Sequence, residues 1–337
     1  MIQILVAALM WMLVASLLIL RRGRAERSIT YSAVTIAVAM TLNIDAAYRW
    51  VDRLAGGRNV VTLLADLALM VGIFFLGRGV AKATEYKSHF VRIALGPLLL
   101  SAAVVGVSLA FAFIRRGATT TTFMLDLGAQ PAAAAYSVIE YAYNGVIVTV
   151  MAIAAAWRIG QSRGVERLPA VALLLGSMCG LVLSIVIIAM DVAHVVGNDN
   201  LMLGLGVLYS PLFLVTFILL CLGLASLPAI RWVRARGRAE KTQDLVARIT
   251  PAWERASSVR PGVSSRALGS FTTEDAEAKL HRQIVEIRDA LFDPRVSFTL
   301  TVAERQLVES AEAHLTGRDA PAATDSEPRL GRTKAAH

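Results

Sequence analysis

The sequence is poor in the patterns that carry recognisable chemistry. It has only two cysteines, Cys179 and Cys221, and each lies inside a long apolar stretch, where free cysteine is a common packing residue. It has no paired-cysteine or His-Glu-x-x-His metal motif, no glycine-rich phosphate loop and no nucleophile elbow. Nothing therefore points to an enzyme, and no cofactor is expected.

Apolar residues are what the sequence has in abundance. Hydrophobic residues make up 56% of the 337 positions, and the mean hydropathy of +0.59 is too high for a soluble protein of this length. A helix needs about 20 apolar residues to cross a bilayer. Stretches of about that length lie at residues 2–20, 30–48, 59–77, 93–114, 133–157, 168–190 and 204–229. We therefore predict an all-α fold, a seven-helix transmembrane bundle whose first partner is the lipid bilayer.

The basic residues between these stretches predict an orientation. Loops rich in Lys and Arg stay cytoplasmic, and sixteen such residues fall in loops one, three and five and just after the last stretch, against five in the other loops. The pattern predicts a multi-pass protein of the plasma membrane with its N-terminus outside and its C-terminus in the cytoplasm. It also accounts for most of the net charge of +9. Residues 231–337 hold 18 basic and 15 acidic residues, a balance that gives no reason to expect nucleic acid as a partner.

Composition changes after the last apolar stretch, where charge rises and prolines punctuate the chain. The predicted domains are a membrane domain at 1–230, a cytoplasmic helical domain at 231–316 and a disordered tail at 317–337. Within the second domain we predict a short amphipathic helix over 241–249, stopped by Pro251, and a loop over 251–270. Thr272 is a candidate cap for the next helix, and Thr301 with Glu304 has the spacing of a capping box for the last one.

The segment from Leu280 to Leu291 reads Leu-His-Arg-Gln-Ile-Val-Glu-Ile-Arg-Asp-Ala-Leu. It resembles a motif of a family of actinobacterial integral membrane proteins whose activity is unassigned, with a weaker echo over 245–253. Members of that family pair an N-terminal multi-span region with a C-terminal domain of unknown function, and some are labelled transporters. The resemblance implies the same architecture here.

Residues 273–316 form the candidate surface for a cytoplasmic protein partner, and no oligomeric state is predicted. The charged residues of the motif are Arg282, Glu286, Arg288 and Asp289. They are candidates for partner binding, but they also suit pairs on the surface of one helix, such as Arg282 with Glu286 at i and i+4.

The acidic residues of the apolar stretches all fall in the predicted outer half of the membrane. Carboxyl groups at membrane depth are costly, so they tend to pair, titrate or bind something. Asp66 and Glu140 form the predicted central pair, and the other candidates for ion or ligand binding are Asn144, Tyr143, Asp45, Asn43, Asp191 and His194. Because no basic residue lies near these acids within the stretches, we predict a protonatable site open to the outside.

Two classes of function fit these features. In the first, a proton, cation or small ligand enters an outward-facing acidic pocket, and the change is relayed to the cytoplasmic domain, as in a sensor or receptor. In the second, Asp66 and Glu140 couple proton or cation movement to a solute in a secondary transporter. A plainer alternative is that these side chains only bond a Tyr or Asn on a neighbouring helix. The absence of an evident repeat between the halves favours the sensor.

Overall fold

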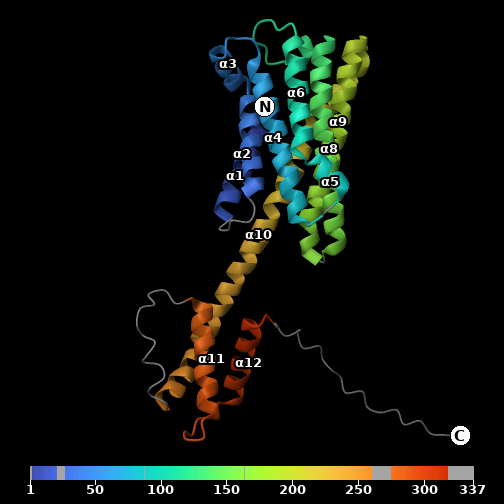
Figure 1. Ribbon diagram of the computed structural model, residues 1–337. Coiled ribbons are helices and arrows are strands. Elements are labelled where there is room, and N and C mark those ends of the chain that lie inside the picture. The colour runs from blue at the N-terminus through green and yellow to red at the C-terminus, as the bar shows by residue number, and fades with distance from the viewer. Residues whose placement is uncertain (1, 21–26, 87, 163, 260–274, 318–337) are drawn as a thin grey trace, which may run out of the picture. The chain divides into compact units, whose positions relative to one another are not determined.

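The computed structural model describes residues 2–20, 27–86, 88–162, 164–259 and 275–317, and every element within them is helical (Figure 1). This confirms the predicted all-α fold class. The chain divides into two compact units, Met1–Ile230 and Arg231–His337. The predicted tail over 317–337 lies almost wholly outside the described residues.

The first unit contains the apolar helices. Five are long and apolar enough to cross a membrane, namely α1 (Ile2–Leu20), α4 (Val60–Ala83), α8 (Pro131–Gln161), α9 (Arg167–Val196) and the first part of α10 (Asp199–Val259). A sixth is reached if α2 (Arg27–Leu42) and α3 (Asp45–Leu54) are taken together. The remaining elements are α5 (His89–Ala94), the apolar but shorter α6 (Pro97–Phe113), α7 (Phe123–Leu127) and a 3-10 turn at Gly164–Glu166. The structure therefore supports a multi-pass membrane protein with five or six candidate spans.

Two predicted boundaries differ from the structure near one end of this unit. The stretch predicted at 30–48 is broken, because the helix stops at Leu42, Ile44 is extended, and α3 leaves at an angle of 86°. Four of the ten residues of α3 are charged, which suits a surface better than a membrane interior. The stretch predicted at 168–190 runs on to Val196, so Asp191 lies inside α9 instead of at its end. We call the end that carries α3, α7 and the loop 114–122 the α3 end.

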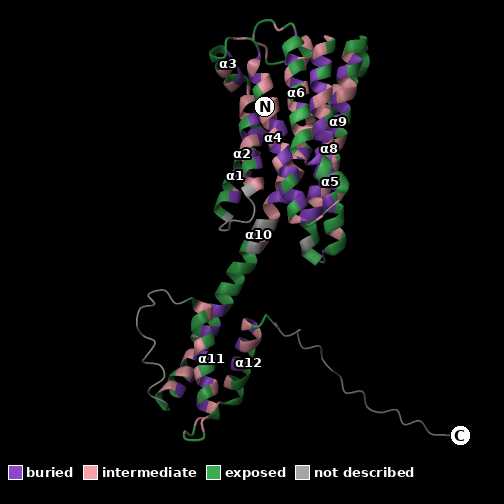
Figure 2. Cartoon of the chain, in the orientation of Figure 1, coloured by how far each residue is buried: buried purple, intermediate pink, exposed green. Residues whose placement is uncertain are grey.

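Buried residues gather where the helices of the first unit face one another (Figure 2). Glycines allow α9 and α10 to approach closely. A Cβ atom on Gly176 of α9 would lie 2.9 Å from the backbone nitrogen of Leu220 on α10, and one on Gly223 would lie 2.9 Å from that of Leu173. Gly176 has the Gly-x-x-x-Gly spacing with Gly180 that permits close helix packing, whereas Gly223 has no such spacing.

The second unit is built from the end of α10, α11 (Ala276–Phe292) and α12 (Val302–Leu315). All three contribute to one apolar core, which includes Ile249, Ile287 and Val308. The helix predicted over 241–249 does not stop before Pro251, and the predicted loop is helical up to Val259. Proline removes one backbone hydrogen bond from a helix. Here the following turns bury Ala252 and Ala256 in the core, which favours continuing the helix.

Caps and ion pairs hold the helices of this unit in register. Thr301 and Glu304 form the predicted capping box at the start of α12. Asp275 caps α11 by accepting from the backbone N–H of Glu277, whereas the proposed cap Thr272 lies outside the described residues. Glu304 also accepts a hydrogen bond from Arg255 of α10 at 2.6 Å.

Substitution of the packing glycines tests the close approach of α9 and α10. Gly176→Ala or Gly223→Ala places a methyl group against backbone, and overpacking of this kind costs about 1–3 kcal/mol. We expect both variants to lower the midpoint of thermal unfolding in detergent micelles. Gly204→Ala in α10 is the control, because its Cβ would meet no atom within 4 Å. Equal midpoints for all three variants would contradict the packing described.

The pH dependence of the start of α12 tests the capping box. The backbone N–H of Thr301 and the Arg255 guanidinium hold the pKa of Glu304 below its ordinary value. The ionised carboxylate therefore stabilises α12 fully above the ordinary Glu pKa of about 4.3, and this contribution is lost as pH falls through the lower folded pKa. Amide hydrogen exchange of residues 302–305, corrected for intrinsic rates, should show protection lost below about pH 4 in the full chain. Glu304→Gln should remove most of this dependence, and Glu309→Gln should not.

Candidate functional site

Helix α8 lies at the centre of the candidate site. It packs against α4, α6 and α9, and two consecutive side chains near its start reach different neighbours. The Tyr136 hydroxyl donates to the Asp66 carboxyl group on α4, and the Ser137 hydroxyl donates to the Asp191 carboxyl group on α9. Tyr136 and Ser137 are each 1% exposed. Two acids from different helices are thereby held on either side of α8.

Glu140 lies one turn along α8 from these residues and is 2% exposed. Its carboxyl group interacts electrostatically with those of Asp66 and Asp191. Its Oε1 atom has no hydrogen-bond partner among the described residues. A buried carboxyl oxygen without a partner is costly, so this atom is the natural position for a proton or a bound cation. We call Asp66, Glu140 and Asp191 the carboxyl cluster.

The polar residues that follow Glu140 on α8 have different surroundings. Asn144 is 4% exposed and lies next to Glu140, and its Oδ1 atom also lacks a described partner. Tyr143 is buried in the apolar core, and its hydroxyl has no described partner either. Asn144 therefore belongs with the carboxyl cluster, whereas Tyr143 shows no interaction with its acids.

The structure does not bring all the predicted residues into the carboxyl cluster. Asp45 is exposed in the first turn of α3, and Asn43 is half-buried in the bend before it. His194 lies one turn beyond Asp191 and interacts with its carboxyl group electrostatically. It also packs close to Gly128, whose Cβ would come within 2.8 Å of the His194 ring nitrogen Nδ1. His194 thus lies at the rim, on the side of α7.

Tyr136, Ser137 and Tyr209 were not among the residues proposed for the site. Tyr136 and Ser137 precede Glu140 by four and three positions, a spacing that places them on its side of α8. Tyr209 on α10 interacts electrostatically with Asp66 and Glu140, so a fourth helix reaches the carboxyl cluster. No pattern in the sequence distinguishes Tyr209 from an ordinary tyrosine in an apolar helix.

A hydrogen-bonded network closes the α3 end. The Asp52 side chain is fully buried and accepts from the backbone N–H of Asn59 at 3.0 Å, the backbone N–H of Val61 at 3.3 Å and the Thr119 hydroxyl at 2.6 Å. The Asn59 amide in turn donates to the Ala118 carbonyl at 3.1 Å. The network ties α3, the start of α4 and the loop 114–122 together.

Asn59 itself adopts a left-handed backbone conformation, with φ of 58°. Its Oδ1 atom accepts from the Tyr48 hydroxyl at 3.0 Å and from the backbone N–H of Thr120 at 2.8 Å. Asparagine tolerates this conformation better than most residues, and here its side chain joins three segments. In the same loop, hydrogen bonds from Thr120 and Thr122 hold the pKa of the exposed Asp126 below its ordinary value.

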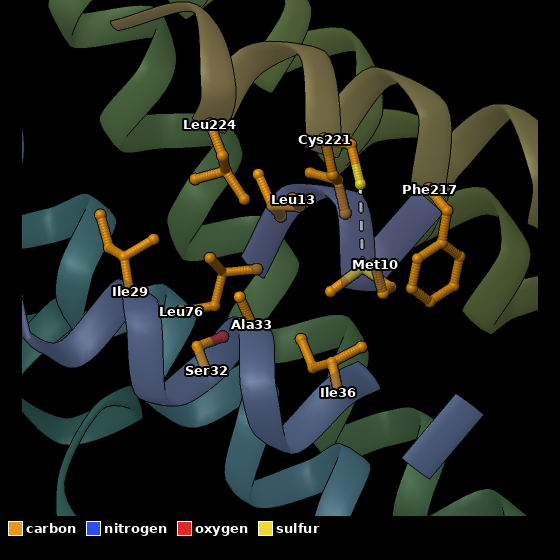
Figure 3. Close-up of a pocket in the computed structure, with 11 residues that line it drawn as sticks. Met10, Leu13, Ile29, Ser32, Ala33, Ile36, Leu76, Phe217, Cys221 and Leu224 are labelled. Carbon is orange, nitrogen blue, oxygen red and sulfur yellow. Dashed lines mark hydrogen bonds between the residues drawn. The ribbon is translucent and has the colours of Figure 1, made fainter. Parts of the chain in front are cut away.

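One cavity of the first unit lies elsewhere, among α1, α2, α4 and α10 (Figure 3). Its volume of about 20 Å³ leaves room for roughly one water molecule. Its walls are apolar apart from Ser32, whose hydroxyl donates to the Gly72 carbonyl at 2.7 Å, and Cys221, whose thiol meets the Met10 sulfur at 3.7 Å. Carboxyl groups are absent from this lining. The cavity therefore offers no chemistry comparable with the carboxyl cluster.

The ligand chemistry of the carboxyl cluster is restricted. Within the described ranges, no three His, Cys, Asp or Glu side chains are grouped so as to hold a metal ion. The atoms on offer are carboxyl oxygens, an amide oxygen and tyrosine hydroxyls. This set suits a proton or a single positive charge better than a multivalent metal ion, which requires several ligands at once.

The candidate partner residues of the second unit make contacts within that unit. Arg288 donates to both carboxylate oxygens of Glu312 on α12, at 2.8 and 2.9 Å. Glu286 accepts a hydrogen bond from the Trp253 indole on α10. Arg282 and Asp289 lie on the same helix, α11, and also have interactions. These side chains support the fold of the unit, and a role in partner binding stays a prediction.

Removal of Asp52 tests the network at the α3 end. Asp52→Ala leaves two backbone N–H groups and the Thr119 hydroxyl without their acceptor, which should lower the free energy of unfolding by about 2 kcal/mol or more. Asp45→Asn is the matched control, because Asp45 is an exposed acid on the same helix, and we expect a change of about 0.5 kcal/mol at most. Unfolding in micelles would measure both. A similar loss for the two variants would argue against the buried role of Asp52.

Comparison with known proteins adds no assignment to this site. No protein-family model, curated protein or solved structure matches the chain. The resemblance of residues 280–292 to an actinobacterial membrane family accordingly stays a prediction.

Proposed function

We propose that this chain is a membrane sensor that responds to protonation, or to binding of a small cation, at the carboxyl cluster. The observation that carries the proposal is Glu140, whose buried Oε1 atom lacks a described partner and whose carboxyl group interacts with Asp66 and Asp191. Adding one positive charge relieves the repulsion among the three acids and satisfies the open oxygen. Removing it restores both costs. Protonation or cation binding therefore changes which arrangement of these helices is the most stable.

The site is proposed to open towards the outside of the plasma membrane. The charge of the loops supports an outside N-terminus, seven spans with α2 and α6 among them, and a second unit in the cytoplasm. Under this topology the α3 end faces outwards. Asp66 then lies about 9 Å from the start of α4, since a helix rises about 1.5 Å per residue. The Asp52 network would control access to the site from that side.

The second unit is the proposed receiver of the signal. Helix α10 carries Tyr209 near the carboxyl cluster and continues as a single helix to Val259, where it contributes to the core of the second unit. A displacement of α10 in the membrane is thereby transmitted along a continuous backbone. The surface of residues 273–316 would pass the signal to a cytoplasmic protein.

The rest of α8 supports a site with access from one side only. Beyond Asn144, its buried residues carry no polar side chain up to the end of the helix: Gly145, Ile147, Val148, Val150, Met151, Ala152, Ala154 and Ala155. A transporter needs polar groups along a path through both halves of the membrane. The apolar face of α8 favours a sensor.

A coupled secondary transporter is the alternative, and one observation favours it. Ser184 and Ser177 continue along α9 from Asp191 at seven-residue spacing, and both are buried. The Ser184 hydroxyl donates to its own helix at Gly180, whereas the Ser177 hydroxyl has no described partner. A polar line of this kind could extend a path past Asn144.

Hydrogen exchange of the full chain in lipid nanodiscs tests the sensor. Glu140→Gln imitates the protonated carboxyl group, so its exchange pattern at neutral pH should match that of the unmodified chain at acidic pH in α10, in α11 and in α12 beyond residues 302–305, whose capping box responds to pH by itself. Asp45→Asn, an exposed acid outside the carboxyl cluster, should keep the ordinary pH response. Tyr136→Phe provides a second variant that removes the bond to Asp66. If the exchange rates of α11 and of α12 beyond residues 302–305 change neither with pH nor with Glu140→Gln, the sensor proposal is wrong.

Proton flux into proteoliposomes separates the sensor from the transporter. We expect no flux above that of empty liposomes when a pH-sensitive dye is trapped inside. Flux that depends on Glu140 and falls in a Ser177→Ala variant would establish the transporter instead.

A further inference from the structure

Helix α3 presents three different faces around its ten residues. Tyr48 and Asp52 point into the protein, where both are buried and hydrogen-bonded to the start of α4. Trp50 and Leu54 lie on the opposite face, since successive residues are rotated by about 100°. They are 65% and 72% exposed. A large apolar face pointing away from the protein requires an explanation.

The third face of α3 is basic. Arg49 and Arg53, spaced at i and i+4, lie between the buried face and the apolar face, and both are exposed. Arg58 follows just beyond the helix and is also exposed. Asp45 is the exposed acid of this segment, whereas Asp52 is buried in its network. The accessible charge of α3 and its loop is therefore positive.

The position of α3 matches a membrane surface. It leaves the apolar α2 at 86°, so it runs along the bilayer surface if α2 crosses the bilayer, as in the proposed topology. Tryptophan is enriched at the level of lipid headgroups, and short amphipathic helices with basic polar faces bind in that layer. The Asp52 network fixes the rotation of α3, which keeps Trp50 and Leu54 turned away from the bundle.

We propose that α3 is an interfacial helix that binds anionic phospholipid. Trp50 and Leu54 enter the upper acyl region, while Arg49, Arg53 and Arg58 pair with headgroup phosphates. Charge complementarity favours an anionic lipid over a zwitterionic one. The proposal is independent of proton sensing, because none of these residues belongs to the carboxyl cluster.

Spin labels on two faces of α3 test its contact with lipid. Single-cysteine variants Leu54→Cys and Arg49→Cys are made in the full chain with Cys179 and Cys221 replaced by alanine, and are labelled in nanodiscs. We expect the label at 54 to be more accessible to oxygen, which concentrates in the bilayer, and the label at 49 to be more accessible to a water-soluble nickel chelate. Nickel access at both positions would overturn the proposal. So would shielding of position 54 from both reagents, since that result would indicate a protein or a second copy on this face.

Lipid retention tests the charge preference. Chains are purified from mixed phosphatidylcholine and phosphatidylglycerol, and bound lipids are counted by native mass spectrometry. The double variant Arg49→Gln, Arg53→Gln should lose phosphatidylglycerol severalfold while keeping phosphatidylcholine. The control Arg248→Gln, Arg305→Gln removes the same charge from exposed positions of the second unit and should retain both lipids as the unmodified chain does. Equal retention of phosphatidylglycerol in the two double variants would refute the preference.

Discussion

The structure of the membrane unit depends on one requirement, which is that polar side chains inside apolar helices must find partners on other helices. The hydrocarbon core supplies no water, and an unpaired polar group there is costly. Tyr136 and Ser137 meet this requirement by bonding Asp66 and Asp191 on opposite neighbours. These two bonds define the rotation of α8 relative to α4 and α9. They also place Glu140 between two acids, with one oxygen left open.

Other contacts hold the helices where those bonds can form. Gly176 and Gly223 let α9 and α10 approach backbone to backbone, which brings Tyr209 within reach of the carboxyl cluster. At the α3 end, Asp52 caps α4 and fastens the loop 114–122. The strain of a left-handed Asn59 is offset by its side-chain hydrogen bonds to α3 and to the loop 114–122. The acids are thus surrounded by well-packed helices. A change in their charge therefore acts directly on the helices that carry them.

The two units use polar groups in different ways. In the membrane unit, the polar groups of the carboxyl cluster and of the Asp52 network join helices near one end, where the proposed signal enters. In the second unit they lie between helices as ion pairs such as Arg288 with Glu312, which are half-exposed and help set the register of the helices. Helix α10 belongs to both units. A sensor requires a site that responds, a unit that receives the signal and a helix that connects them. The carboxyl cluster, the second unit and α10 fill these roles in the proposal, and the lipid contact proposed for α3 would anchor the end that responds.

Local patterns in the sequence were sufficient for several features. Apolar length located the long helices, composition marked the change near residue 231, and the Thr301–Glu304 spacing predicted the cap of α12, because each depends on residues close together in the chain. The bend before α3, the passage of α10 through Pro251 and the separation of Tyr143 from Asn144 were decided by tertiary structure. Periodicity reports which residues share a side of one helix, but it does not report which neighbour that side meets. Asp66 and Glu140 were recognisable as unusual from the sequence alone, whereas their connection through Tyr136 required the packing of α4 against α8.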